Sequence, residues 1–421
     1  MQTELPLKQS SPSLLKVAWT GSRRGLKSAW LVALVVLVLY ALWLFSFFEM
    51  GGEARDFILP GRNFLQQSQI SSLIKLDPTY TRYQSNNTGY DGQFCYYLAL
   101  DPRNARFYMD DPAYRYTRIL YPMAARLLAF GQADLIPFTL IIVNWLALAG
   151  GTLAVAAWLK RKGLSPWLAL VYGLYPGFII SLQRDLTEIL AYSLIAVAVY
   201  FFDFGGRWRI LWAGLGFALA VLARESVAIF PFFYALSLLF EGEPKITWQV
   251  RVRSNWLKAI LLLVLAISPM VLYKIGLALW LKSFSLGAGS SLELIPFQGI
   301  IKNFPWENEK MEQIRSIIIP ALICFVAALV ALWKGVWRAE VGNLLVNIQL
   351  FIIMLPASSY VEMAASARIG AGVVLAALYC LPYLFTNNRS WFWASTVLWL
   401  SLVPFWLIIP TVTNLWLFFT R

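Results

Sequence analysis

The sequence contains no histidine. This absence excludes Ser-His and Cys-His nucleophile systems, HExxH zinc sites and histidine proton relays, so any acid–base chemistry must come from Asp, Glu, Lys, Tyr or Cys. Three cysteines, Cys95, Cys324 and Cys380, are too few for a disulfide framework. Cys324 and Cys380 lie within apolar segments, where we expect them to be small core residues.

Charged residues are also scarce, at 14% of the 421 residues, whereas 59% of the residues are hydrophobic and the mean hydropathy is +0.63. Such a composition excludes an ordinary soluble protein, and no polar stretch is long enough to fold alone. We therefore expect residues 1–421 to form a single integral-membrane domain. Basic residues that face anionic lipid headgroups explain the net charge of +13, so nucleic acid is not an expected partner.

The sequence is rich in long apolar runs. A run of about 18–20 apolar residues can span a bilayer as a helix. The pattern predicts an all-α, polytopic membrane protein with about eleven transmembrane helices. The runs are 30–48, 134–158, 165–181, 186–203, 210–223, 226–240, 259–280, 316–333, 341–357, 368–385 and 391–411.

The distribution of Lys and Arg predicts the orientation. Alternate short loops, such as those with Lys160–Lys162 and Arg251–Lys258, are rich in Lys and Arg, which places them and the N-terminus in the cytoplasm. The amphipathic stretch Leu14–Lys27 is then expected to lie on the inner surface. In this N-in topology, 49–133 is a long first extracytoplasmic loop and 282–315 is a second outer loop.

The first outer loop has the pattern of interfacial or re-entrant helices. Residues 63–76 have apolar positions at helical spacing. A second helix is expected to begin near Asp91 and to end at Pro102. The apolar segment Ile119–Phe130 is too short to cross the membrane, so we expect it to lie in the interface or to re-enter.

Asp91 is the first residue that could do chemistry, and two interpretations apply to it. Asp at a helix start often accepts backbone hydrogen bonds as an N-cap. Alternatively, Tyr90 and other aromatic residues around it form a semi-apolar pocket, and Gly92 leaves room for a close approach of the backbone. Desolvation there would raise the pKa of Asp91 towards that of a useful general base.

Arg-acid groups stand between later apolar runs on the same side. Arg184, Asp185 and Glu188 form one group, Arg224 and Glu225 a second, and Glu362 lies near Arg368 in a third. One interpretation is structural: Asp185 and Glu188 form a capping box, Arg184 pairs with Glu188, and Arg224 pairs with Glu225. The other is functional, because ionisable groups at the edge of hydrocarbon cost about 2.5–3.5 kcal/mol each and usually mark a site.

Arg115, Arg118 and Arg368 are further candidates for phosphate binding, since guanidinium groups match phosphate oxygens and stay charged. Interfacial anchoring beside tyrosines is the alternative for Arg115 and Arg118. Asp110 and Asp111 could form a metal pair or an exposed acidic turn before a proline, and no spacing in the sequence specifies a metal.

Two motifs and the layout carry a family resemblance. A first helix precedes the long loop with Gly-Tyr-Asp-Gly-Gln-Phe (89–94), and Tyr-Thr-Arg-Ile-Leu-Tyr-Pro (116–122) precedes the second span. In these features the chain resembles the GT-C superfamily of multi-spanning glycosyltransferases that use polyprenyl-phosphate sugars. The motifs are similar to segments of bacterial GT-C-like proteins linked with cell-surface glycopolymers. The motif match covers about 91–122, and the layout match covers most of the chain.

The resemblance implies an inverting transfer from a polyprenyl-phosphate-linked sugar to an acceptor hydroxyl on a glycan, lipid or protein, at the extracytoplasmic face of a bacterial inner membrane. An acidic residue of the first outer loop is the catalytic base in the superfamily, which assigns that role to Asp91. The superfamily's Asp-x-Asp form is absent because residue 93 is Gln. This favours a single acid, and no cofactor is assigned, although a divalent metal stays open.

The remaining site residues divide by expected role. Arginines that would bind the donor phosphate are Arg115, Arg118, Arg184, Arg224 and Arg368, and residues that would hold the acceptor or support the site are Tyr90, Asp185, Glu188 and Glu225. The alternatives are a flippase or transporter of lipid-linked sugars, which would use the same arginines, and an enzyme like an O-antigen ligase or polymerase.

Overall fold

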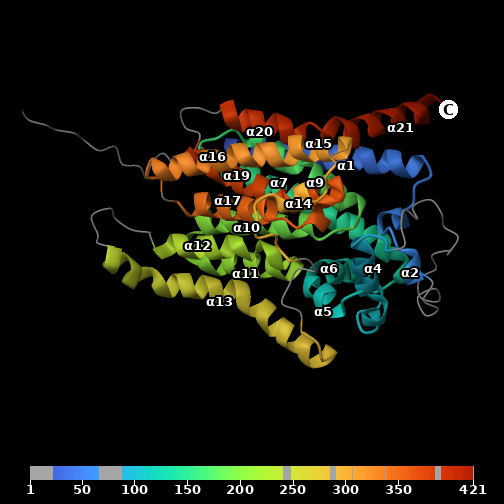
Figure 1. Cartoon of the computed structure of the whole chain (residues 1–421), viewed down its shortest axis with the longest axis horizontal. Helices are drawn as coiled ribbons and strands as arrows, with labels where there is room; N and C mark the ends of the chain where they lie inside the picture. The colour runs from blue at the N-terminus through green and yellow to red at the C-terminus, as the bar shows by residue number, and fades with distance from the viewer. Residues whose placement is uncertain are drawn as a thin grey trace, which may run out of the picture.

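The structure, a computed structural model, describes residues 22–65, 88–239, 248–284, 291–305, 307–336, 338–384 and 390–420. Across these ranges the chain is helical, and its β-type pairing is one isolated bridge between Pro60 and Gly89. The long helices lie roughly side by side in one bundle (Figure 1). This confirms the all-α prediction.

The helices of the bundle are α1 (Ser22–Glu49), α7 (Ile136–Arg161), α8 (Leu170–Gly173), α9 (Pro176–Gln183), α10 (Glu188–Phe204), α11 (Arg209–Ala223), α12 (Ile229–Leu239), α13 (Trp248–Leu281), α16 (Ile319–Trp333), α17 (Ala339–Ile348), α18 (Met363–Ile369), α19 (Ala371–Leu384), α20 (Ser390–Leu400) and α21 (Ile409–Thr420). Further short helices are α2 (Arg62–Leu65), α4 (Gly92–Leu100), α5 (Pro112–Arg115), α6 (Leu120–Leu128), α14 (Gln298–Ile301) and α15 (Asn308–Gln313).

Seven helical segments in the described part of the chain are long and apolar enough to cross a membrane. They are Lys27–Glu49, Ala133–Arg161, Gly206–Ala223, Asn255–Leu281, Asn308–Trp333, Met363–Leu384 and Ser390–Thr420. The chain is therefore an integral, polytopic membrane protein.

The other four predicted runs are also helical but shorter. Run 165–181 is broken between α8 and α9, because Pro176 disfavours helical backbone at the residue before it, and Tyr175 has φ −59° and ψ 128°. Runs 186–203, 226–240 and 341–357 overlap α10, α12 and α17, respectively. The total of about eleven crossings and the N-in orientation stay predictions.

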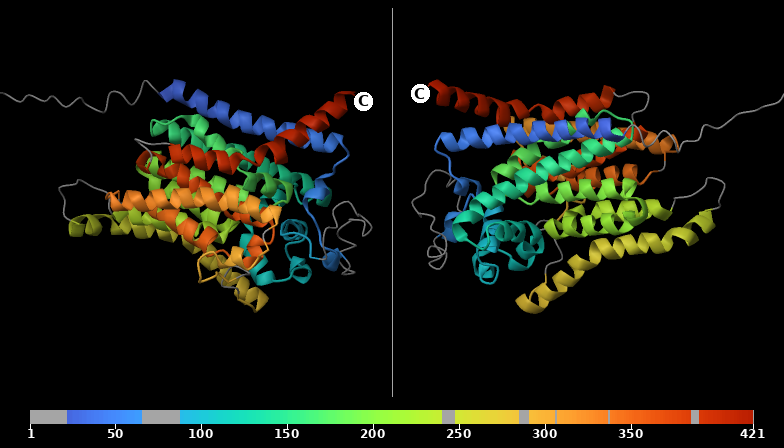
Figure 2. Two further views of the ribbon diagram at one scale, coloured as in Figure 1. Left: turned by 45° about the horizontal axis from the view of Figure 1, so that its top comes forward. Right: turned by 180° about the vertical axis from the view of Figure 1, so that it is seen from behind.

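α13 lies at the outside of the bundle and packs mainly on α11 and α12 (Figures 1 and 2). On its outer face, Leu257, Leu272 and Leu279 are more than half exposed, as expected of a helix that faces lipid. It bends in its course, and Pro269 inside the helix removes a backbone donor and explains the bend.

The first long loop is partly helical. α4 confirms the helix expected between Asp91 and Pro102, and α6 confirms a short helix within Ile119–Phe130. The helix expected at 63–76 begins with α2, and the rest of it, from residue 66 onward, lies outside the described residues, as does most of Leu14–Lys27. Arg126 of α6 donates to the carbonyl oxygens of Ala99 and Leu100, both at 2.7 Å, which ties the end of α4 to α6.

Candidate active site

Asp91 lies at the turn that leads into α4. Gly89, with φ +68°, supplies the left-handed backbone conformation of this turn, and Tyr90 N–H donates to the Leu59 carbonyl at 2.9 Å. Asp91 occupies the N-cap position, but its side chain makes no capping hydrogen bond. The N-cap interpretation of this carboxylate is therefore wrong, and its oxygens face arginines instead.

Two arginines bind the carboxylate of Asp91 from distant segments. Arg115 Nη1 lies 2.9 Å from Oδ1, and Arg368 Nη2 lies 2.6 Å from Oδ2. The arginine side chains are 13% and 12% exposed, and that of Asp91 is 26% exposed. Arg115 also binds Asp110 at 2.7 Å and lies over the Phe94 ring. Asp91 is thus fixed between α5 and α18.

Glu188 is a second, more deeply buried carboxylate in the same cluster. Its Oε1 lies 2.9 Å from Arg224 Nη1 and 3.2 Å from Arg368 Nη1, and its side chain is 1% exposed. Arg368 therefore bridges Asp91 and Glu188. Buried charges of this kind persist only when they are paired.

The remaining predicted pairs also differ from the local ones expected. Arg118 binds Glu225 at 3.1 Å and contacts the Tyr114 hydroxyl, while Arg184 binds Glu362 at 3.3 Å. The predicted pairs Arg184–Glu188 and Arg224–Glu225 are therefore wrong. Charged residues that are neighbours in the sequence bind different partners, because their side chains lie against other helices and not against each other.

Asp185 stands apart from the arginines. It is fully buried, has φ +48°, and one carboxyl oxygen lies 3.5 Å from the Tyr121 hydroxyl. Burial raises the pKa of Asp185 well above its ordinary value, which favours the neutral form. The capping-box prediction is wrong here, because Thr187 precedes α10 and makes no side-chain cap.

Tyr90 lies between two of the arginines. Its ring is 4.1 Å from the Arg184 guanidinium and 5.2 Å from that of Arg368. Its buried hydroxyl has no hydrogen-bond partner. This places Tyr90 as the wall between the cluster around Asp91 and the neighbouring space that Arg184 faces.

The pKa of Asp91 differs from the sequence prediction. Burial favours the neutral form, as expected, but Arg368 and Arg115 outweigh it and hold the pKa of this carboxyl well below its usual range. Asp91 is therefore ionised and strongly paired in this structure, and the predicted rise in its pKa is wrong for this state.

Gly92 explains how α4 comes so close to the turn at 184–185. A Cβ atom at this position would lie 1.9 Å from the Arg184 carbonyl oxygen. Only glycine permits this approach. The space expected beside Gly92 is therefore filled by the backbone of Arg184. The contact brings Asp91 next to the start of α10.

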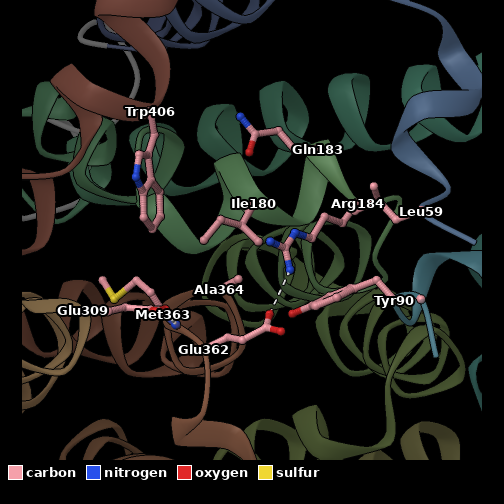
Figure 3. Close-up of a pocket in the computed structure, with 11 residues that line it drawn as sticks. Leu59, Tyr90, Ile180, Gln183, Arg184, Glu309, Glu362, Met363, Ala364 and Trp406 are labelled. Carbon is pink, nitrogen blue, oxygen red and sulfur yellow. Dashed lines mark hydrogen bonds and ion pairs between the residues drawn. The ribbon is translucent and has the colours of Figure 1, made fainter. Parts of the chain in front are cut away.

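Two cavities adjoin these residues. One of about 20 Å³ is lined by Asp91, Arg115, Arg118, Glu188 and Arg368, together with Cys95, and it has room for little more than a water molecule. The other, of about 530 Å³, is bordered by Tyr90 and Arg184 (Figure 3). A ligand headgroup that enters the smaller cavity must therefore break some of the ion pairs that line it.

The larger cavity contains residues that the sequence analysis did not assign to the site. Gln183, Glu309 and Trp406 line it together with Arg184 and Glu362 (Figure 3). The proximity of Glu362 to Arg368 in sequence was a signal for that residue. Glu309 and Trp406 lie far from any motif, so no local pattern could have found them.

The structure describes no group of three or more Asp, Glu or Cys side chains that could hold a metal ion among the residues it covers. Asp110 binds Arg115, and Asp111 accepts a hydrogen bond from Tyr114 N–H at 3.1 Å as the cap of α5. These contacts account for both carboxylates without a shared ligand.

In comparisons with known proteins, no family model, no curated protein and no solved structure matches the chain, so its function has to be inferred from this geometry.

Proposed function

We propose that the protein is an inverting GT-C-type glycosyltransferase that moves a sugar from a polyprenyl-phosphate donor to an acceptor hydroxyl, with Asp91 as general base. The observation that carries the proposal is the double contact of Arg368, which joins Asp91 at 2.6 Å to buried Glu188 at 3.2 Å. Three further arginines lie around these two carboxylates: Arg115 and Arg118 from one stretch of the chain, and Arg224 from another.

The position of the cluster supports a lipid-linked substrate. Its charges lie at the ends of apolar helices, beside segments long enough to cross a membrane. Ionisable groups at such positions are costly and mark functional sites. In this proposal a lipid phosphate reaches them from within the bilayer, since guanidinium groups bind phosphate oxygens in a bidentate manner.

The ion pairs of Asp91 suggest how the base becomes active. A donor phosphate that binds Arg115 and Arg368 competes with Asp91 for both guanidinium groups. Once these contacts weaken, burial dominates and raises the affinity of the Asp91 carboxylate for a proton. Donor binding thus prepares the base.

The transfer is then a single displacement. Asp91 accepts the proton of the acceptor hydroxyl while the oxygen of that hydroxyl forms a bond to the anomeric carbon of the donor sugar. The bond from that carbon to the phosphate oxygen breaks, and the electron pair leaves with the lipid phosphate. Arginines of the cluster, Arg118 and Arg224 among them, stabilise the developing charge. Attack from the opposite face inverts the configuration of the sugar.

The same proposal includes the location. With the N-terminus in the cytoplasm and about eleven crossings, the cluster opens to the extracytoplasmic face of a bacterial inner membrane. The high Lys and Arg content of the predicted cytoplasmic loops supports this orientation.

Replacement of Asp91 tests the assignment. Asp91→Asn keeps the size of the side chain but removes the base, so we expect transfer from a polyprenyl-phosphate sugar to fall by about 10²–10⁴-fold. The measurement is transfer of radiolabelled sugar by purified protein in nanodiscs, with thermal unfolding as the control for folding. Near-normal turnover would exclude Asp91 as base, and movement of labelled lipid-linked sugar without transfer would favour a flippase.

A further inference from the structure

We infer that the cavity beside Tyr90 is the acceptor site and that it takes an uncharged carbohydrate; this inference rests on the proposed glycosyltransferase function and names its second substrate class. The cavity measures about 530 Å³, which is within the range of small-ligand sites. It lies next to the arginine cluster but differs from it in chemistry.

The charge of the cavity disfavours a phosphate. Its lining includes one guanidinium, Arg184, and two carboxylates, Glu309 and Glu362. Arg184 is already paired with Glu362 at 3.3 Å. A phosphate would therefore meet a net negative lining, whereas the arginines that favour an anion surround Asp91 on the other side of Tyr90.

The same groups suit a ligand with many hydroxyls. Carboxylates accept hydrogen bonds from hydroxyls, and the Gln183 amide can both donate and accept. Glu309 Oε1 accepts a hydrogen bond from Met363 N–H at 2.5 Å, which holds this carboxylate at the start of α18. The buried Tyr90 hydroxyl still lacks a partner. Polar groups fixed around a pocket in this way give orientation to a neutral polar ligand.

Trp406 supplies an apolar wall. Its indole projects from the chain near α21 into the space bordered by Ile180 and Met363 (Figure 3). An indole face packs against flat apolar surfaces such as the C–H face of a sugar ring. A pocket with one aromatic wall and several hydrogen-bonding groups fits a carbohydrate better than either a lipid tail or an ion.

Tyr90 connects this cavity to the base. It precedes Asp91 in the chain, and its ring lies between Arg184 on the cavity side and Arg368, which binds Asp91. For a sugar in the cavity to present a hydroxyl to Asp91, the Tyr90 side chain must turn aside, while the donor phosphate approaches through the arginines. The two substrates would meet at Asp91 from different sides.

Saturation-transfer NMR with a panel of methyl glycosides of common hexoses and pentoses tests the assignment on the full-length protein in nanodiscs. We expect signals from sugar ring protons with the wild type and with Asp91→Asn. Trp406→Ala and Glu309→Gln should each lower the affinity for the bound glycoside about fivefold or more. Trp416→Ala is the matched control, since Trp416 lies in α21 and is 69% exposed. Each variant is first checked for the elution volume and unfolding temperature of the wild type.

Three outcomes would overturn the inference: no glycoside gives a signal, Trp406→Ala binds as well as Trp416→Ala, or inorganic phosphate displaces the glycosides. The result is separable from that of the proposed function. If glycoside binding depends on Trp406 but Asp91→Asn transfers sugar normally, the cavity is a carbohydrate site and Asp91 is not the base. If Asp91→Asn loses transfer but no glycoside binds, the role of Asp91 is supported and the acceptor-site assignment is wrong.

Discussion

At the scale of single residues, the charged cluster depends on ion pairs between distant segments. Arg368 and Asp91 are separated by 277 positions in the chain and Arg118 and Glu225 by 107, yet both pairs are in hydrogen-bond contact. A buried pair offsets desolvation only while both partners are present, so removal of one partner leaves an uncompensated charge.

The pair Arg118–Glu225 gives a stability prediction. Arg118→Met and Glu225→Met should each lower the free energy of unfolding by about 3–5 kcal/mol, because each leaves one charge unpaired. The double variant should lose about 1–3 kcal/mol less than the sum of the two. Reversible SDS unfolding followed by circular dichroism measures this. Simple additivity would show that the pair has no energetic coupling.

The proposed release of Asp91 by the donor predicts a pH dependence. Asp91 acts when deprotonated, so activity falls as the pH drops through its pKa. In the free protein that pKa is held well below the ordinary value by Arg368 and Arg115, which outweigh the opposing effect of burial. Since kcat/KM for the donor reports the free protein and kcat reports the donor complex, the acid limb of kcat should lie at higher pH than that of kcat/KM. Coincident limbs would contradict the release of Asp91 by phosphate.

Residue identities were more predictable from the sequence than residue partners. Charges beside apolar runs are rare, which made Asp91, Glu188 and Arg368 visible as candidates. Their pairing was not visible, because helix spacing suggests only contacts three or four positions apart. The low pKa of Asp91 followed from those unseen partners, so the sequence prediction of a raised pKa failed.

At the scale of elements, the contact between the start of α4 and the turn at 184–185 positions the site. Gly92 is the residue that permits it, since an added Cβ would meet backbone rather than a movable side chain. The turn at 184–185 in turn leads to Glu188 at the start of α10. A shift of α4 would therefore separate Asp91 from Glu188 and Arg368.

Gly92→Ala should lower the free energy of unfolding by about 1–3 kcal/mol and reduce transfer, because the backbone cannot yield to the new methyl group. Gly150→Ala is the control: it lies in α7 with no atom within 4 Å of an added Cβ, so it should be neutral or stabilising by up to about 1 kcal/mol. Equal effects of the two substitutions would exclude the proposed role of this contact.

Apolar runs predicted the helices well, since length and hydropathy are local properties. They did not predict that residues 166–183 would form separate short helices, although Pro176 gave a signal for the break. They also could not place α15 beside α18, where Glu309 contacts Met363. That contact brings together segments with no shared pattern.

At the scale of the whole molecule, the short helices α4, α5 and α6 and the segments with α14 and α15 lie towards the same end of the bundle (Figure 1). The end of α13 also reaches this region, where Tyr273 donates to the Tyr116 carbonyl at 3.0 Å. An arrangement with one elaborated end and one end of short connections suits an enzyme that works at a single membrane face.

The proposed orientation can be tested in intact cells. Native Cys95, Cys324 and Cys380 are buried and should react little. A membrane-impermeant maleimide should label Asp134→Cys, whose side chain is 77% exposed, because residue 134 lies on the predicted outer side. It should label Arg207→Cys, on the predicted inner side, only after the cells are permeabilised. If Arg207→Cys is labelled in intact cells and Asp134→Cys only after permeabilisation, the predicted orientation is wrong and Asp91 faces the cytoplasm.

In the proposed function, Arg115 and Arg368 hold the phosphate of a lipid-linked sugar next to Asp91. Mass spectrometry of the lipid that copurifies with the protein tests it most directly. We predict a polyprenyl-phosphate monosaccharide with the wild type and its loss in Arg115→Gln, while Lys302→Gln, which changes an exposed cation on the 282–315 segment, retains it. Recovery of ordinary phospholipids alone, or equal recovery of the sugar lipid from both variants, would contradict the claim.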